Sequence, residues 1–255
     1  MGRVIFVSAG PGAADLITLR GARALGQADV VLFDALTDPA LRELAPQARW
    51  LDVGKRGFCN SAKQESINAL LVAQAQKHAC VVRLKGGDAS IFGRLEEELL
   101  ALAKAGIDSE VVPGVTAAIA AAAHSQRPLT RRGQGRSVSL TTAMTREGEL
   151  QAARSADTEV FYMAGQQLGA LARKLLEAGW PADTPVLVTS RAGCADALAS
   201  DHCVGALAAA SLLHKGRPTV VTVGAGARKL QKSPARHEFH APAMADDASV
   251  NSLIL

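Results

Sequence analysis

Aromatic residues are scarce in this sequence. Tryptophan, tyrosine and phenylalanine together make up 4% of its 255 residues, too few for the stacking platforms on which many proteins hold single-stranded nucleic acids. The formal net charge is only +4, and the basic residues are scattered rather than gathered in the long runs that nucleic-acid-binding arms use. The sequence therefore predicts no nucleic-acid partner, and its mild positive charge fits an acidic small molecule better than a duplex.

Cysteine is also rare. The four cysteines lie far apart and form no C-x-x-C pair, so that neither a zinc site nor a disulfide framework is predicted; they are Cys59, Cys80, Cys194 and Cys203. His237 and His240 in "HEFH" lie three residues apart, but no further candidate ligand supports them. We therefore predict no metal site.

Long apolar runs are absent as well. No run approaches the length of a membrane span. The first residues, "MGRVIFVSAGPG", pass directly into a glycine turn, and their apolar run is too short for a secretory signal with a cleavage site. Together with the scattered cysteines, these features predict a cytoplasmic protein without a membrane partner.

The sequence is rich in alternating patterns. Short β-branched runs alternate with longer segments of alanine and leucine, which is typical of β-α-β units and a largely parallel sheet. Strands are predicted near residues 3–8, 29–33, 49–53, 80–84 and 109–112, with helices near 14–26, 63–77 and 94–105. A helix after "VPGVT" runs through "AAIAAAAH" and is stopped by Pro128. Further strands are predicted near 137–142, 158–162, 185–190 and 218–223, with a helix near 166–178.

This order of elements predicts the α/β fold class, with two α/β domains and a ligand cleft between them. The N-terminal domain is expected to span residues 1–114 and the C-terminal domain residues 115–227. The last stretch, residues 228–255, loses apolar periodicity and mixes proline, alanine and charged residues. It is predicted to be a disordered tail.

The opening stretch "VIFVSAGPG" and the acid Asp34 after "VVLF" together suggest a nicotinamide site. The dinucleotide fingerprint needs a third glycine for close packing of the helix on the strand, and Asp15 stands there instead. Pro11 also removes a backbone N–H that would bind a pyrophosphate. The loop suits a ligand that contacts backbone without bringing two phosphates, and a dinucleotide-binding oxidoreductase remains the less favoured alternative.

Four further motifs follow the opening in fixed order: "VGKRG" at 53–57, "VVRLKGGDASIFGR" at 81–94, "VVPGVTAA" at 111–118 and "RPLTRRG" at 127–133. This series resembles the tetrapyrrole (class III) S-adenosylmethionine methyltransferases over roughly residues 4–225. Within that family it is most similar to members that methylate uroporphyrinogen III. The resemblance implies C-methylation of uroporphyrinogen III to precorrin-2, via precorrin-1, in sirohaem or cobalamin biosynthesis, with S-adenosyl-L-methionine as cofactor and S-adenosyl-L-homocysteine as its product. It also implies a homodimer.

The glycines of "KGGD" follow a predicted strand, where open α/β sheets bind ligands, and they carry no Cβ that would keep a ligand away. The resemblance implies that Gly86, Gly87 and Asp88 contact the cofactor, with Ile91 beside them and Pro11 in the first loop. A sulfonium ion needs no metal, and a carboxylate such as Asp88 supplies opposite charge. A tight turn capped by Asp88 is the alternative reading of this motif.

Four more cofactor residues follow from the resemblance. Thr116 and Ala117 in "PGVTAA" begin a predicted helix, and Thr116 is also a good N-cap by residue type. Met163 ends a predicted strand in "VFYMAG", where a soft thioether can fill an apolar gap or contact a ligand. Ala192 in "TSRAG" is the fourth.

The resemblance gives Asp34 and Lys55 catalytic roles. Asp34 is expected to be the proton acceptor and Lys55, in "GKR", the proton donor. A pyrrolic carbon that attacks a methyl group must afterwards lose a proton, which a positioned carboxylate can take. Without the resemblance, a helix cap and a solvated charge would explain these two residues.

The substrate implied by the resemblance is a polycarboxylate, which fixed arginines can bind. The arginines in or next to the motifs are Arg56, Arg83, Arg94, Arg127, Arg131 and Arg132. The sequence departs from the usual family pattern near the expected ligand sites, at Leu95, Glu96, Arg131, Met144, Ser190 and Arg191. A later precorrin as substrate and a binding-only relative without turnover therefore stay open as alternatives.

Overall fold

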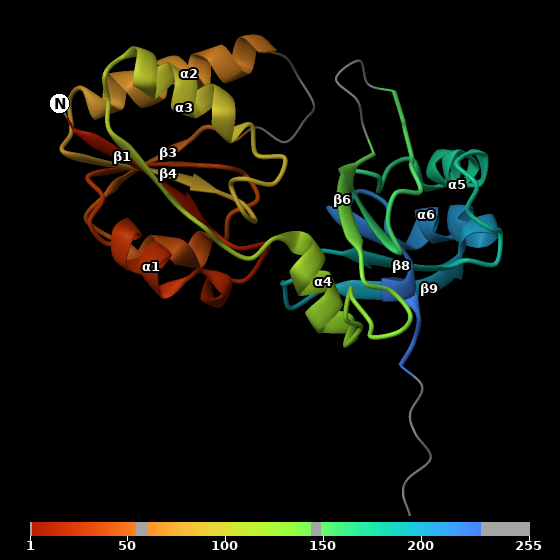
Figure 1. Ribbon diagram of the computed structural model, residues 1–255. Coiled ribbons are helices and arrows are strands. Elements are labelled where there is room, and N and C mark those ends of the chain that lie inside the picture. Colours follow the sequence, from red (N-terminus) through yellow and green to blue (C-terminus); the bar gives the residue numbers. More distant parts are fainter. Residues whose placement is uncertain (1, 55–60, 144–148, 231–255) are drawn as a thin grey trace, which may run out of the picture.

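The computed structural model describes residues 2–54, 61–143 and 149–230, with only the backbone for 61–63. Each of two five-stranded sheets forms the centre of one half of the chain (Figure 1). The predicted α/β class with two sheets is therefore confirmed. The expected boundary at 114/115 falls in the segment between the last strand of the first sheet and the next helix.

The first sheet is entirely parallel and has the order β3-β2-β4-β1-β5. Its strands are β1 (Arg3–Ser8), β2 (Val30–Phe33), β3 (Arg49–Asp52), β4 (Cys80–Lys85) and β5 (Ser109–Val112). β1 and β4 are buried along nearly their whole length, as strands of a parallel sheet covered on both faces must be. The carboxyl ends of all five strands meet at one edge, which is where such sheets bind ligands.

Helices cover both faces of this sheet (Figure 1). α1 (Leu19–Leu25) lies on one face, and α2 (Ser61–Ala75) and α3 (Leu95–Lys104) lie side by side on the other. Alternate residues of β4 serve the two layers, so that Val82 belongs to one apolar cluster and Val81 to the other.

The helix expected at 14–26 is interrupted. A 3₁₀ turn, η1 (Ala14–Leu16), is followed by an extended Thr18, whose Oγ1 accepts a hydrogen bond from the Gly21 N–H at 3.1 Å and so starts α1. The extended Ile17 ends the first helical segment, and the Thr18 cap begins the second, within a single apolar pattern. A second 3₁₀ helix, η2 (Pro39–Leu44), is capped by Asp38.

The second sheet is mixed, with the order β6-β7-β10-β8-β9. Its strands are β6 (Val138–Thr142), β7 (Thr158–Tyr162), β8 (Pro185–Ser190), β9 (Leu198–Cys203) and β10 (Thr219–Gly224). Only β6 and β7 pair in parallel; the other three pairs are antiparallel. The expectation of a largely parallel arrangement is thus wrong for this half. β9 was not predicted, because its half-polar sequence "LASDHC" has no clear alternation. Its pairing with β8 is antiparallel because the short link between the two strands leaves no room for a crossover helix.

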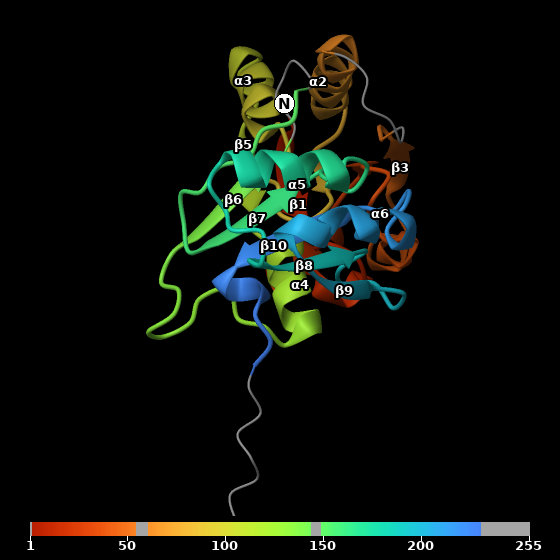
Figure 2. The ribbon, with the colours of Figure 1, turned by 90° about the vertical axis from the view of Figure 1, so that its right-hand side faces the viewer.

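Helices cover both faces of the second sheet as well (Figure 2). α4 (Ala117–Ser125) packs on Val160 and Val220 from one side. α5 (Leu168–Glu177), α6 (Ala210–Leu213) and the 3₁₀ helix η3 (Val204–Ala209) pack on Phe161 and Val221 from the other. The chain then passes through η4 (Ala225–Ala227).

A hydrogen-bonded network of buried and half-buried polar side chains surrounds His214. The His214 ring lies 2.9 Å from Ser190 Oγ through Nδ1 and 2.8 Å from Ser200 Oγ through Nε2. Ser200 also contacts His202, and Arg217 donates to Ser190. Burial lowers the pKa of His214, and the neighbouring His202 and Arg217 lower it further. A buried imidazole is therefore kept neutral where β8, β9 and α6 meet.

This pKa shift predicts acid-dependent stability. The unfolded chain takes up a proton at the ordinary histidine pKa of 6.5, above the lowered pKa of the folded state. The stability is therefore fully present above about pH 6.5 and is lost as the pH falls toward the lower folded value. Denaturant unfolding should show that the free energy of unfolding decreases as the pH is lowered from about 8 to about 5. His214→Gln keeps hydrogen-bonding groups but cannot titrate, so this decrease should be smaller in that variant. An equal decrease of the free energy of unfolding in His214→Gln would show that another group causes the pH dependence.

None of the described helices is long and apolar enough to cross a membrane. Within the described residues, no group of three or more His, Cys, Asp or Glu side chains is arranged to hold a metal ion.

Candidate functional site

Two glycine loops meet at the carboxyl edge of the first sheet. The Gly10 N–H donates to the Gly87 carbonyl at 3.1 Å, and the Gly87 N–H donates back to the Gly10 carbonyl at 2.7 Å. Gly87 has a φ of +69°, which disfavours any side chain, and a Cβ added there would meet no atom within 4 Å. The backbone at Gly87 therefore borders open space, as a cofactor-binding loop requires. The neighbouring Gly86 lies close to Leu36.

Asp88 ties this loop to the segment before α4. Its Oδ1 accepts from the Ser90 N–H and its Oδ2 from the Gly114 N–H, both at 2.8 Å. The turn-capping role is therefore present, and the carboxylate also joins the loop after β4 to the segment before α4. Ile91 is half-buried and donates its N–H to the Asp88 carbonyl. The expected cofactor contacts of both residues stay a prediction.

The two halves of the chain touch through their loops. The Ala13 N–H donates to the Gly193 carbonyl at 2.9 Å, and a Cβ on Gly12 would lie only 2.6 Å from the Gly193 carbonyl carbon. A Cβ on Gly193 would in turn lie 3.0 Å from the ring of Pro11. Pro11 is thus at the junction of the domains, and Ala192, next to Gly193, is buried against α4.

Tyr162 organises the start of α4. Thr116 precedes this helix at the N-cap position, but its side chain does not cap it; Thr116 Oγ1 lies 2.7 Å from the Tyr162 hydroxyl instead. The hydroxyl accepts from the Ala118 N–H at 3.2 Å and so replaces the cap. The ring lies 5.1 Å from that of Phe92, across the junction. Ala117 is the first residue of the helix.

Sequence reasoning missed Tyr162, the only tyrosine of the chain, although it immediately precedes the predicted Met163. We expect Tyr162→Phe to lower the free energy of unfolding by about 1 kcal/mol, because the Ala118 N–H and Thr116 hydroxyl lose their partner. Phe92→Leu, which removes the ring contact but spares the hydroxyl, is the matched comparison. Denaturant unfolding of Tyr162→Phe that matches the parent protein would contradict the capping role.

Four residues in loops of the two domains have strained backbones. Phe92, Arg94, Met163 and Arg191 all have a positive φ, between +51° and +59°. Such conformations are uncommon outside glycine and gather at ligand sites. Met163 is 41% exposed despite being apolar. Phe92 contacts Tyr162 across the junction, Met163 follows Tyr162, and Arg191 lies two residues before Gly193, so that these three border the same junction as Pro11.

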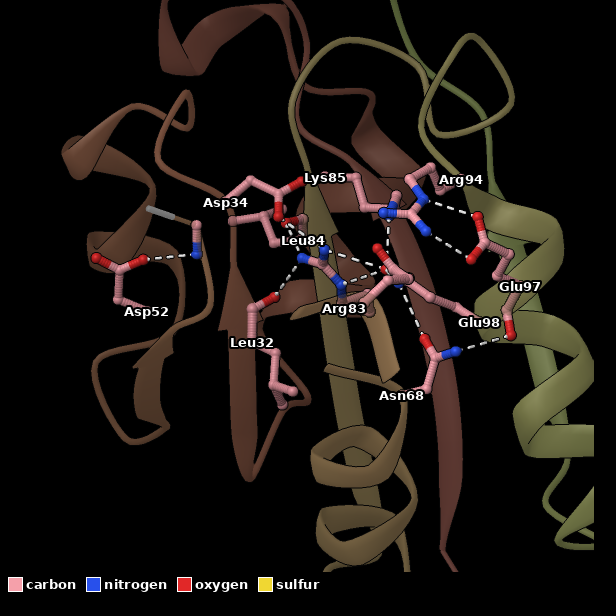
Figure 3. Close-up of polar contacts among 12 residues, drawn as sticks. Leu32, Asp34, Asp52, Asn68, Arg83, Leu84, Lys85, Arg94, Glu97 and Glu98 are labelled. Carbon is pink, nitrogen blue, oxygen red and sulfur yellow. Dashed lines mark hydrogen bonds and ion pairs between the residues drawn. The ribbon is translucent and has the colours of Figure 1, made fainter. Parts of the chain in front are cut away.

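Asp34 follows β2 at the carboxyl edge of the first sheet and contacts a buried cluster of charges (Figure 3). Its Oδ1 lies 2.7 Å from Nη2 of Arg83, while its side chain stays 31% exposed. Arg83 also contacts Glu98 of α3 at 3.2 Å, and Lys85 contacts the same carboxylate oxygen at 2.9 Å. The other proposed catalytic residue, Lys55, lies outside the described residues.

The cluster affects the titration of its cations in opposite directions. Burial lowers the pKa of Arg83, but the carboxylates of Asp34 and Glu98 more than offset it, so that the pKa of Arg83 lies above its ordinary value. Burial and the charge of Arg83 hold the pKa of Lys85 below its ordinary value, although Glu98 acts in the other direction. Arg83 is therefore a permanent cation beside Asp34.

Four of the arginines expected to face a polycarboxylate have partners within the protein: Arg83, Arg94, Arg127 and Arg131. Arg83 is buried in the charge cluster. Arg127 pairs with Asp201 and donates to the Ala227 carbonyl, and Arg131 donates to the carbonyls of residues 228 and 229. The last two fasten the segment after β10, where the predicted tail begins; residues 231–255 and Arg56 lie outside the described residues.

Arg94, the strained residue that precedes α3, pairs with Glu97. A pocket of about 600 Å³ lies beside it, lined by Phe92, Arg94 and the apolar side chains of α3. Gly86, Gly87 and Asp88 do not line this pocket. It is therefore distinct from the space that Gly87 borders.

Comparison with known proteins agrees with this geometry. The family model described as Tetrapyrrole (Corrin/Porphyrin) Methylases matches residues 3–199. Uroporphyrinogen-III C-methyltransferase of Pseudomonas aeruginosa is 46% identical over 195 residues, which cover 75% of this chain and 80% of that protein. Siroheme synthase 1 of Yersinia pseudotuberculosis is 43% identical over 225 residues, 86% of this chain but 47% of the longer relative.

A solved structure supports the same assignment. It is uroporphyrin-III C-methyl transferase from Thermus thermophilus complexed with S-adenyl homocysteine, which matches with a TM-score of 0.77 at 35% identity over 88% of this chain and 97% of that chain. The family model and these relatives agree with the series of motifs from the first glycine loop to "VVPGVTAA". The chain belongs to the tetrapyrrole methylase family.

Proposed function

We propose that this protein transfers methyl groups from S-adenosyl-L-methionine to carbon atoms of uroporphyrinogen III, giving precorrin-2 via precorrin-1 in sirohaem or cobalamin biosynthesis. The observation that carries this proposal is the 46% identity to a uroporphyrinogen-III C-methyltransferase over 80% of that protein's length. The open space beside Gly87, at the edge where parallel sheets bind ligands, agrees with it.

The described residues fit S-adenosylmethionine chemically. Its bound sulfonium supplies an electrophilic methyl group and leaves as the thioether of S-adenosyl-L-homocysteine. Gly86, Gly87 and Ile91 would bind it through one loop, with Asp88 supplying negative charge nearby. The site would be completed by Pro11, Thr116, Ala117, Met163 and Ala192. The closeness of Pro11 to Gly193 and the contact of Thr116 with Tyr162 support this.

The protein's task in the chemical step is to orient the reactants and move a proton. A pyrrolic carbon forms the new C–C bond as the C–S bond breaks, and a proton must then leave the macrocycle. The Asp34 carboxylate, partly exposed at the sheet edge, would accept that proton. Lys55 would serve as the proton donor. Alignment of the reacting atoms would account for most of the remaining acceleration.

Incubation with uroporphyrinogen III and S-adenosylmethionine, followed by mass analysis, tests the proposal. Products heavier by one and two methyl groups are expected. Turnover only with a later, already methylated precorrin would assign the alternative substrate, and S-adenosylhomocysteine binding without any product would indicate a binding-only relative. Thermal protection by nicotinamide cofactors but not by S-adenosylhomocysteine would revive the oxidoreductase reading.

We further propose a homodimer working in the cytoplasm. The family resemblance supports the dimer, and the scattered, unpaired cysteines fit a reducing compartment. Sedimentation velocity at micromolar concentration should give the mass of two chains. A monomer that remains fully active would refute the dimer, and fractionation of cells tests the compartment.

A further inference from the structure

We propose that Arg83 is the positioning residue of this reaction: it holds one oxygen of the Asp34 carboxylate in place and leaves the other for the substrate. This inference rests on the proposed function, because it deepens the role given there to Asp34. The sequence suggested a different role for Arg83, as one of several arginines that bind a polycarboxylate. Its burial and its partners point instead to a role inside the protein.

The sheet itself brings the two residues together. β2 and β4 are parallel neighbours in which Leu32 pairs with Arg83. Asp34, two residues beyond Leu32, leaves the end of β2, and its N–H reaches the Leu84 carbonyl at 3.3 Å. The Arg83 side chain then spans the short distance from β4 to the end of β2 (Figure 3). The pairing register therefore fixes which carboxylate Arg83 can reach.

The Arg83 guanidinium is held by more than Asp34. Nη1 donates to the carbonyls of Leu32 and Leu84, at 3.4 and 3.1 Å, and Nε and Nη2 both donate to Oε1 of Glu98, at 3.3 and 3.2 Å. Nη2 also donates to Asp34 at 2.7 Å. A planar group bound on several sides has little freedom to rotate. It can therefore fix the direction of the carboxylate that it binds.

Of the four charged side chains in this cluster, only that of Asp34 is substantially exposed to solvent. Arg83 is 2% exposed, Lys85 4% and Glu98 not at all, whereas Asp34 is 31% exposed. Within the described residues, Asp34 is thus the member of this cluster that a substrate can reach. Arg83 is its only hydrogen-bonding side-chain partner there, through Oδ1. Among the described residues no hydrogen bond is made to Oδ2, so that this oxygen can accept a proton.

Stability alone gives a poor account of this arrangement. Buried ion pairs are often no more stabilising than apolar residues of the same volume. Here the donors of Arg83, Lys85 and Gln64 all converge on Oε1 of Glu98, while its buried Oε2 has no partner within the described part of the chain. Glu98 therefore fixes the Arg83 guanidinium through Oε1 although its Oε2 is left without a partner among the described residues, and the guanidinium in turn fixes Asp34.

In the proton transfer, Asp34 accepts the proton and Arg83 only orients Asp34. The proton leaves the macrocyclic carbon for Asp34 Oδ2, and the electron pair of the C–H bond stays in the ring. Arg83 is a permanent cation and exchanges no proton. Its contribution is to keep the accepting oxygen in line with that carbon, where a displacement of about 1 Å can cost about a hundredfold in rate.

A double-mutant cycle tests the inference with the full-length protein. Arg83→Lys keeps the positive charge but loses the fork that joins Asp34 to Glu98. We expect kcat to fall about tenfold or more, with KM for S-adenosylmethionine and the S-adenosylhomocysteine Kd nearly unchanged. In Asp34→Asn the same Arg83→Lys change should cost almost nothing further, because its target has already been removed.

Lys85→Met is the matched control. Lys85 shares the Glu98 oxygen and the burial of Arg83, yet makes no hydrogen bond to Asp34. The fold reduction of kcat in the double variant Lys85→Met/Asp34→Asn should therefore equal the product of the two single reductions. If the kcat reductions of Arg83→Lys and Asp34→Asn also multiply in the double variant, or if Arg83→Lys loses cofactor affinity in parallel with kcat, Arg83 acts only through the fold and the inference is overturned.

The same experiment separates this inference from the proposed function. Absence of methyl transfer by the parent protein would refute the proposed function before any variant is compared. Active parent protein with a fully active Asp34→Asn would remove the role of Asp34 and with it that of Arg83. An impaired Asp34→Asn beside a fully active Arg83→Lys would refute the positioning role alone.

Discussion

Replacing Gly87 by leucine should weaken S-adenosylhomocysteine binding about a hundredfold or more while the protein stays folded. Gly87 has a φ of +69°, and a Cβ there would enter open space rather than the core. The strain of a leucine in this conformation costs about 1–3 kcal/mol, which a folded domain can tolerate. The side chain would occupy the space expected for the cofactor. Calorimetric titration should show affinity reduced about a hundredfold or more, which corresponds to roughly 2.7 kcal/mol.

Gly106→Leu is the matched control for this prediction. Gly106 has a φ of +66°, and a Cβ there also meets no atom within 4 Å. It lies between α3 and β5, away from the carboxyl edge of the sheet. The backbone strain is the same, but cofactor affinity should be retained. Equal losses in the two variants, or normal affinity in Gly87→Leu, would remove the main support for the cofactor site.

Asp34→Asn should leave the fold and the cofactor affinity intact and lower turnover about a hundredfold or more, as expected when a general base is removed. The amide is nearly isosteric, and its oxygen can still accept from Arg83. Single-turnover rates with saturating cofactor, measured beside the S-adenosylhomocysteine Kd, separate the two effects. A role in holding a cofactor ribose predicts the opposite result, with weaker cofactor binding and a nearly normal rate at saturation.

Asp52 offers a comparison at the neighbouring strand end. It ends β3, and its carboxylate accepts from the Gly54 N–H at 2.9 Å. Asp52→Asn should keep almost full turnover because this acid has a local structural partner. Full activity in Asp34→Asn would refute its catalytic assignment even if the protein proves to be a methyltransferase.

The first half of the fold could be predicted because each strand is a compact apolar run separated from the next by a helical segment. β1 and β5 match the predicted ranges 3–8 and 109–112. β9 could not be predicted, since its residues alternate poorly and its place depends on pairing with β8 rather than on local propensity. The break before α1 depended on the Thr18 cap inside an otherwise continuous apolar pattern.

The candidate site was predictable where a backbone feature carries the signal. The glycines of "KGGD" and the strand-end acid Asp34 are visible in sequence because parallel strand ends meet at one edge. The partners of Asp34 were not, since Glu98 comes from a helix, and only packing of α3 on the sheet brings it to Arg83. Tyr162 was missed for the same reason: its hydroxyl acts on a helix that begins 45 residues earlier, at Ala117.

The position of β10 has a consequence for synthesis of the chain. The first sheet is complete once β5 has emerged, so that this half can fold during translation, as N-terminal domains generally do. The second sheet has β10 at its centre, paired with both β7 and β8. Until this last strand arrives, β6-β7 and β8-β9 are two separate ribbons with unpaired edges, which are prone to aggregate. A stalled or shortened product that ends before Thr219 would therefore carry a folded N-terminal half and an incompletely folded, aggregation-prone C-terminal half.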